Sequence, residues 1–265
     1  MDEKQVADFY DAVGSGYDGS LYFLVCDPLY QAEIARFTKG RRFGRVLDLG
    51  CGTGKQTVLL APHAEEVWAI DLSGESLRQA ERRCVRSGFH NVKFLEQSIV
   101  ALPAEDRSVD AIFSYGDVVS HIHDAYPRVF RECARVLAPG GLLAFETDGK
   151  WELDMLLHNP EERARARAAR GVGHLRVWRD IPCKTFTVPE LTGVLHGVGL
   201  RVIRIRGVNI LHCLLPERVL MGLPSEVGWG WRTISAVLER LDAAAGTCPA
   251  LYRLASTRLV AATKS

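Results

Sequence analysis

The chain has 265 residues, of which 47% are hydrophobic, and its formal net charge is +1. This length and apolar content suit one α/β domain with additions, and the near balance of charge argues against a nucleic-acid-binding protein. The N-terminus is acidic and polar, and no apolar run approaches the roughly 18 residues that cross a bilayer. We therefore expect a cytoplasmic protein that makes no membrane contact.

Seven cysteines are scattered along the chain, and no Cys-x-x-Cys pair occurs. An odd number without regular spacing predicts neither a disulfide framework nor a zinc site. We expect these cysteines to be small buried side chains in a reducing compartment, and we expect no bound metal.

The first half of the chain alternates short apolar runs with amphipathic stretches. This alternation indicates βαβ units, which place a parallel sheet between helices on both faces. The predicted strands cover 46–49, 67–70, 92–95, 109–115 and 142–145, and the predicted helices cover 55–60, 74–88 and 126–137.

The pattern changes after Trp151. A charged helix is predicted at 161–170, and Thr187 is a plausible N-cap for a helix with Pro189 in its first turn. Neither a repeat nor a long linker is visible, so we expect one domain over 1–265. The remaining predictions are strands at 201–206 and 258–263, an irregular insertion at 207–230 and an amphipathic helix at 231–245.

The most informative motif is VLDLGCGTG at 46–54, where an apolar run ends in Gly50, Gly52 and Gly54. Glycine permits the positive φ angles of a sharp turn from strand to helix. It also lets a ligand approach the main chain closely. The motif therefore predicts a loop that holds a nucleotide-like cofactor above a parallel sheet.

Two phosphate-containing cofactors fit this loop poorly. A nucleoside triphosphate loop needs Ser or Thr after its lysine and a glycine five residues before Gly54, but the chain has Gln56 and Leu49 there. A dinucleotide loop needs a third glycine where the chain has Lys55.

The glycine motif and three later segments resemble the class I S-adenosylmethionine-dependent methyltransferases. The later segments are VWAIDLS, which contains Asp71, LEQSIVALPAEDRSVDAIFSYG at 95–116 and RVLAPGGLLAFET at 135–147. The resemblance covers about 5–150 and is greatest to the ubiquinone/menaquinone-biosynthesis methyltransferases and their small-molecule relatives. The last third matches loosely, through KTFTVPEL at 184–191 and the final strand.

The resemblance implies a Rossmann-like, seven-stranded, mostly parallel sheet with helices on both faces. It also implies N-terminal lid helices at 1–40, a cofactor-binding core at 41–150, and substrate-side elements with an insertion and closing strands at 151–265. S-adenosylmethionine is the implied cofactor, and S-adenosylhomocysteine is the implied product.

The cofactor site follows from the resemblance. Asp71 is expected to accept hydrogen bonds from both ribose hydroxyls; the alternative is that it caps the helix that begins at Gly74. Asp48 is expected to order the loop and the cofactor's amino group. Gly50 and Gly52 are expected to let the backbone approach the methionine moiety. The cofactor-binding prediction includes Gly50, Gly52, Gly54 and Leu72.

Three further residues are expected at the cofactor. The family has an aspartate at the position of Ser98, and its carboxylate accepts from the adenine amino group; serine accepts without charge, so the contact is weaker here or a neighbour replaces it. Ile99 is expected to offer its backbone N–H to the adenine ring. Tyr115 is expected to contact the methionine portion, because electron-rich groups stabilise a sulfonium.

The remaining candidate residues are aromatic. Tyr17 is expected to close over the cofactor and exclude water, or else to pack on the core. His121 and His123 are candidates for a general base or a substrate contact, with a surface or capping role as the alternative. The expected substrate wall contains Tyr22, His121, Trp151, Trp178 and, in the insertion, His212, Trp229 and Trp231.

These residues predict methyl transfer to an oxygen, nitrogen or carbon nucleophile of a small molecule. Two alternatives stay open: an enzyme that uses S-adenosylmethionine for chemistry other than methyl transfer, and a nicotinamide-dependent reductase. We expect no nucleic-acid partner, and formation of a homodimer is left open.

Overall fold

The computed structural model describes residues 3–13, 21–178, 181–210, 240–242 and 244–265. A seven-stranded sheet forms its centre, in the order β3-β2-β1-β4-β5-β9-β8. Neighbours are parallel from β3 to β5, and β9 runs antiparallel to both β5 and β8. The strands are β1 (Phe43–Leu49), β2 (Ala64–Asp71), β3 (Val92–Glu96), β4 (Val109–Ser114), β5 (Leu137–Asp148), β8 (Leu200–Val208) and β9 (Thr257–Lys264).

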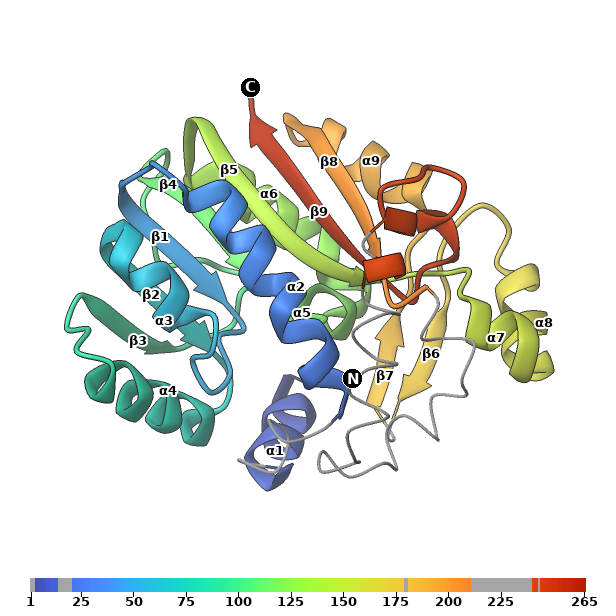
Figure 1. The fold of residues 1–265 in the computed structure, drawn as a ribbon, viewed down its shortest axis with the longest axis horizontal. Helices are drawn as coiled ribbons and strands as arrows, with labels where there is room; N and C mark the ends of the chain where they lie inside the picture. The colour runs from blue at the N-terminus through green and yellow to red at the C-terminus, as the bar shows by residue number, and fades with distance from the viewer. Residues whose placement is uncertain (1–2, 14–20, 179–180, 211–239, 243) are drawn as a thin grey trace.

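Helices cover both faces of this sheet (Figure 1). On one face, α2 (Leu21–Thr38) runs across β1, β4 and β5, next to α3 (Thr57–Leu60) and α4 (Gly74–Arg86). The other face is covered by α6 (Tyr126–Val136) and α9 (Val188–Gly197). The predicted Rossmann-like α/β fold is thus confirmed.

Both faces of the central strands are buried, which explains why the strands read as continuous apolar runs. In β1, Val46 packs with the residues of α2, whereas Leu47 and Leu49 pack with those of α6. Helix α9 begins where its N-cap residue predicts. Thr187 caps α9, because its hydroxyl accepts from Glu190 N at 3.2 Å while the Glu190 carboxylate accepts from Thr187 N at 3.3 Å.

The strand order places a topological switch point between β1 and β4, because the chain builds outwards from β1 to β3 and then returns to the other side of β1. Ligands of open α/β sheets bind at the carboxyl ends of the strands on either side of such a point. The glycine motif follows β1 there, and Tyr115 follows β4.

The N-terminal segment differs from the predicted lid. Instead of one lid over 1–40, α1 (Glu3–Val13) lies beside the carboxyl ends of the strands, whereas α2 belongs to a helical layer of the sheet. The Tyr30 side chain of α2 is buried, and its hydroxyl donates to Glu146 of β5 at 2.7 Å. Of the two described N-terminal helices, α1 therefore lies at the site and α2 does not.

A second sheet was not predicted. It is a hairpin of β6 (Leu175–Trp178) and β7 (Ile181–Lys184), which lies beyond the carboxyl ends of the central strands near α7 (Leu153–His158) and α8 (Pro160–Ala168). Ion pairs hold it to the rest of the chain: Arg176 pairs with Asp148 at 2.9 Å, and Lys184 pairs with Glu190 at 2.9 Å. The short elements of the described residues include α5 (Val118–His121) and the 3-10 helices η2 (Ala61–His63), η3 (His123–Ala125) and η5 (Tyr252–Leu254).

Other boundaries moved by a few residues. β5 begins at Leu137, directly after α6, and so includes the Pro139-Gly140-Gly141 turn that was expected only to end the helix. Most of the predicted insertion and of the helix at 231–245 lies outside the described residues; of that helix, 240–242 and 244–245 are helical.

Of the six cysteines in the described residues, five are buried, as predicted, and Cys248 is exposed; Cys213 lies outside those residues. Within the described residues, three or more His, Cys, Asp or Glu side chains do not gather in a metal-binding group. No helix in that part of the chain has the length and apolar character needed to cross a membrane.

Candidate functional site

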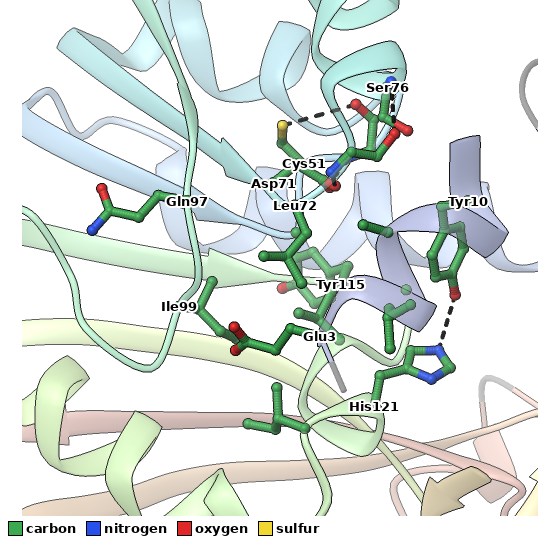
Figure 2. Close-up of a pocket in the computed structure, with 18 of the residues that line it drawn as sticks. Glu3, Tyr10, Cys51, Asp71, Leu72, Ser76, Gln97, Ile99, Tyr115 and His121 are labelled. Atoms are coloured by element: carbon green, nitrogen blue, oxygen red, sulfur yellow. Dashed lines mark hydrogen bonds between the residues drawn. The ribbon is translucent and has the colours of Figure 1, made fainter. Parts of the chain in front are cut away.

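A cavity of about 420 Å³ lies at the switch point, at the carboxyl ends of β1, β2 and β4 (Figure 2). Its walls are the turns after these strands, the segment after β3 and one side of α1. The α1 residues that line it are Glu3, Val6, Ala7 and Tyr10, whose spacing places them on one face of a helix.

The glycine motif forms the floor of this cavity. Gly50 and Gly52 line it with φ angles of +67° and +50°, in the left-handed region. The space also requires glycine, because a Cβ on Gly50 would lie 2.2 Å from Cγ2 of Val118. The N–H groups of Gly50 and Cys51 both donate to the carbonyl of Ile70, which fixes the loop to β2.

Gly54 serves a different purpose from the one predicted. Among the described residues it is not part of the cavity wall. Its φ is +81°, and a Cβ there would lie 2.8 Å from Cα of Ala80 in α4. Gly54 therefore lets α4 pack closely against the loop.

Asp71 ends β2 and lines the cavity. Its Oδ2 accepts from Gly52 N at 2.8 Å, and its Oδ1 accepts from Ser73 N at 2.9 Å. Burial raises the pKa of Asp71, and these two N–H bonds oppose that rise. The N-cap of α4 is Ser73, whose hydroxyl accepts from Ser76 N, so the alternative interpretation of Asp71 as the cap is wrong.

Asp48 lies beneath the loop rather than in the cavity wall. Its carboxylate accepts from the Thr57 hydroxyl at 2.6 Å, which joins β1 to α3 across the glycine motif. Burial raises the pKa of Asp48 to about 7, and the charge of Asp71 acts in the same direction. The predicted contact with the cofactor's amino group stays a prediction.

The buried Asp48 should make folding stability depend on pH. Its folded pKa exceeds that of an unfolded aspartate, so the folded state holds more protons between about pH 4 and pH 7, and stability is lost as the pH rises through this window. Burial lowers the pKa of His121 to about 4, so this residue makes the stability rise with pH instead. Urea unfolding at pH 5, 6 and 7 is therefore expected to show that Asp48→Asn gains stability relative to wild type as the pH rises. A constant difference between the two proteins would contradict this prediction.

One end of the cavity is apolar. Leu72, Ile99 and Val100 line it, together with Gln97, whose amide donates to the carbonyl of Ala101. Ser98, in contrast, is not part of the wall among the described residues: its hydroxyl donates to Oε1 of Glu3 at 2.5 Å.

The opposite end is built on a buried carboxylate that sequence reasoning missed. Tyr115 lines the cavity and stacks on Tyr30, with ring centroids 5.2 Å apart. Glu146 accepts from the Tyr30 hydroxyl and, at 2.5 Å, from Gly116 N. Burial raises the pKa of Glu146 to about 7. Glu146 thus supports the turn after β4 from below, and its place inside the 135–147 motif was the signal available.

The two candidate histidines lie together in this end of the cavity, and each contacts the unpredicted hairpin. His121 Nε2 lies 2.9 Å from the Tyr10 hydroxyl of α1, and its Nδ1 lies 3.6 Å from Sγ of Cys183. His123 Nε2 lies 2.6 Å from the carbonyl of Pro182. Since a carbonyl can only accept, the proton of His123 is on Nε2.

The predicted substrate wall is only partly described. Trp151 is half-buried beside Lys150, and among the described residues it does not line the cavity. The backbones of Tyr22 and Trp178 lie in α2 and β6, and their side chains lie outside the described part, as does all of Tyr17. The predicted residues that the cavity brings together are Gly50, Gly52, Asp71, Leu72, Ile99, Tyr115, His121 and His123.

Several known proteins that are similar to this chain are methyltransferases. Residues 46–141 match the family described as a methyltransferase domain. The ubiquinone biosynthesis O-methyltransferase of Leptothrix cholodnii is 29% identical over 152 residues, which are 55% of this chain and 63% of that protein. The malonyl-[acyl-carrier protein] O-methyltransferase of Methylococcus capsulatus is 37% identical over 136 residues, 51% of this chain and 46% of that protein. The matched stretch thus spans less than two thirds of either relative.

The solved structure of the [4+2]-cyclase SpnF shares the fold. It superposes with a TM-score of 0.66 at 20% identity, covering 99% of this chain and 96% of that one. The switch-point cavity, the glycine motif and the matched segment together support the resemblance to the class I S-adenosylmethionine-dependent methyltransferases, and residues 46–141 match a methyltransferase domain.

Proposed function

We propose that this protein transfers a methyl group from S-adenosylmethionine to an oxygen, nitrogen or carbon nucleophile of a small molecule. The observation that carries the proposal is one continuous cavity that joins the glycine motif and Asp71 to a second end containing His121 and His123. The first end has the chemistry of a cofactor site, and the second leaves space for an acceptor next to it.

The residues present fit the cofactor. Backbone at positive φ lines the floor at Gly50 and Gly52, so a ligand can approach the main chain. Asp71 offers a carboxylate for the ribose hydroxyls, and the apolar end at Leu72 and Ile99 suits a planar base. When bound, S-adenosylmethionine supplies a methyl group already activated by the positive charge on its sulfur.

The protein's contribution is alignment and exclusion of water. Tyr115 lies between the glycine loop and the histidines, where the reacting groups would meet. Because α1 covers the cavity and its Tyr10 contacts His121, this helix would close the site once it is filled. We propose that α1 is the lid, and that 1–265 acts as one methyltransferase domain.

If the acceptor begins as a hydroxyl or an ammonium, a base must take its proton, and His123 is the better candidate. Burial lowers the pKa of His121 to about 4, which makes its neutral imidazole a weak base at pH 7. Its two ring nitrogens also contact Tyr10 and Cys183. The Nε2–H of His123 donates to the carbonyl of Pro182, so Nδ1 is the nitrogen that would take the proton.

The proposal is tested by thermal shift and by methyl transfer. S-adenosylhomocysteine at 100 times its Kd is expected to stabilise the protein by about 2.7 kcal/mol, and labelled methyl groups from S-adenosylmethionine should appear in acceptors drawn from a panel of phenols, carboxylates, amines and quinols. Stabilisation by NADPH but not by S-adenosylhomocysteine would favour the reductase alternative. Cofactor binding together with conversion of an acceptor that gains no label would favour chemistry other than methyl transfer.

A further inference from the structure

We propose that Glu3, in the lid helix α1, is a cofactor-binding residue that accepts a hydrogen bond from the exocyclic amino group of adenine. It would supply, from a distant part of the chain, the carboxylate that Ser98 does not provide. The inference rests on the proposed cofactor site and adds a residue that determines its preference for adenine.

Glu3 lies at the apolar end of the cavity, where the adenine is proposed to bind. It is the first residue of α1, and it lines the apolar end of the cavity with Ile99 and Val100. Its Oε1 lies 2.5 Å from the hydroxyl of Ser98, although 95 residues separate the two along the chain. Figure 2 shows the Glu3 carboxylate directed towards the segment that carries Ile99.

The contact with Ser98 is not what places α1. The far end of the helix is held independently, because the carboxylate of Asp11 accepts from the hydroxyl of Ser73 at the start of α4. Tyr10 contacts His121 at the opposite end of the cavity, with 2.9 Å between Oη and Nε2. The helix therefore spans the cavity, and Glu3 is brought to the adenine end by contacts elsewhere.

The adenine end of the cavity needs an acceptor for the amino group of the base. Adenine offers a neutral N–H₂ donor, and a carboxylate is the acceptor that strengthens such a bond most. The acidic residues that line the cavity, among those described, are Glu3, Asp71 and Asp124. Asp71 already accepts from the glycine loop at the ribose position, and Asp124 lies with the histidines.

Glu3 has the capacity for this contact. A carboxylate has about four lone-pair sites, and the bond from Ser98 uses one of them. The Ser98 hydroxyl also accepts from Val100 N at 3.2 Å, which fixes its orientation and directs its proton towards Glu3. The pair Glu3–Ser98 thus presents a charged acceptor where serine alone would present a neutral one.

Calorimetry with two ligands tests the proposal. The ligands are S-adenosylhomocysteine and its purine analogue, in which hydrogen replaces the 6-amino group. Wild type is expected to prefer S-adenosylhomocysteine by roughly 10- to 100-fold, the contribution of a hydrogen bond to a charged group. Glu3→Ala is expected to lose most of this preference by binding S-adenosylhomocysteine more weakly, with little change for the analogue.

Asp8→Ala is the matched control, because Asp8 is an exposed carboxylate of the same helix that does not line the cavity. It should keep the preference of wild type. Adding Ser98→Asp to Glu3→Ala should restore the preference, since the carboxylate is then supplied from the other side of the contact.

Two results would overturn the proposal. If Glu3→Ala weakens both ligands equally, Glu3 only holds α1 in place, and if it changes neither, Glu3 does not reach the base. Failure of wild type to bind either ligand would instead refute the cofactor assignment, so the two failures are distinguishable.

Discussion

Replacing Asp71 with alanine is expected to weaken the binding of S-adenosylhomocysteine by at least about 100-fold. Hydrogen bonds to a charged group contribute about 1.5–3 kcal/mol each, and the ribose offers two hydroxyls to this carboxylate. Isothermal titration calorimetry at one fixed pH and salt concentration measures the change.

Part of this effect comes from the protein itself. Asp71 accepts from Gly52 N at 2.8 Å and from Ser73 N at 2.9 Å, so its loss removes the acceptor that fixes the glycine loop. Asp71→Asn separates the two contributions. Its amide keeps one oxygen acceptor but turns a donor towards one of these N–H groups, so it should bind more tightly than Asp71→Ala and more weakly than wild type.

Glu96→Ala provides the control for Asp71→Ala. Glu96 pairs with Asp71 across the parallel strands β2 and β3, yet it is exposed and does not line the cavity. The affinity of Glu96→Ala for S-adenosylhomocysteine should stay within about twofold of wild type, because surface charges contribute little. Wild-type affinity in Asp71→Ala would show that the ribose does not bind at this carboxylate.

The sequence predicted the central sheet because its strands are buried on both faces, which makes each strand a continuous apolar run. The glycine motif was equally local: Gly50 needs both a positive φ and the absence of a Cβ, and these requirements are visible in the residue type. The part of the site that lies at the ends of β1, β2 and β4 could therefore be predicted.

The parts that were missed depend on partners distant in the chain. The β6–β7 hairpin is rich in charge and short, and it is held by the pairs Arg176–Asp148 and Lys184–Glu190. The support of the β4 turn by Glu146 spans 30 residues, and the contact between Glu3 and Ser98 spans 95. Spacing along a sequence gives no signal for such pairs, since only the folded chain brings them together.

Gly54 and Ser98 show a second reason why the cavity wall could not be predicted in full from the sequence. Both occupy positions where the resemblance assigns a cofactor contact, but Gly54 faces α4 and the Ser98 hydroxyl bonds to Glu3. A motif specifies which residue types are compatible with a loop. Which of its members reach the ligand depends on the neighbouring elements.

The largest loss of stability is expected from Arg258→Met. Arg258 lies in β9 with 2% of its surface exposed, and its guanidinium donates to three carbonyls, those of Phe186, Tyr252 and Arg253, at 2.8–3.1 Å. Burial lowers its pKa to about 10, so the group still carries its charge at pH 7.

Methionine fills a similar volume but leaves three carbonyls without this donor, and it removes a positive charge near Asp148 and Glu152. Removing one member of a buried charged group costs about 3–5 kcal/mol. The free energy of unfolding in urea is expected to fall by that amount, and the Tm by on the order of 10 °C. Arg258→Lys keeps the charge but lacks the planar guanidinium group. Its free energy of unfolding should therefore lie between those of wild type and Arg258→Met.

Arg78→Met is the control, because the Arg78 side chain is 63% exposed and pairs with Glu75 across the surface of α4. Its cost should stay below about 1 kcal/mol. A similarly small cost for Arg258→Met would mean that the three carbonyls find other donors.

Because Arg258 bonds to Phe186, which follows β7, the same variant should also loosen the hairpin whose Cys183 and Pro182 contact His121 and His123. The link from β9 to the acceptor end of the cavity would then appear as a larger loss of methyl transfer than of S-adenosylhomocysteine affinity.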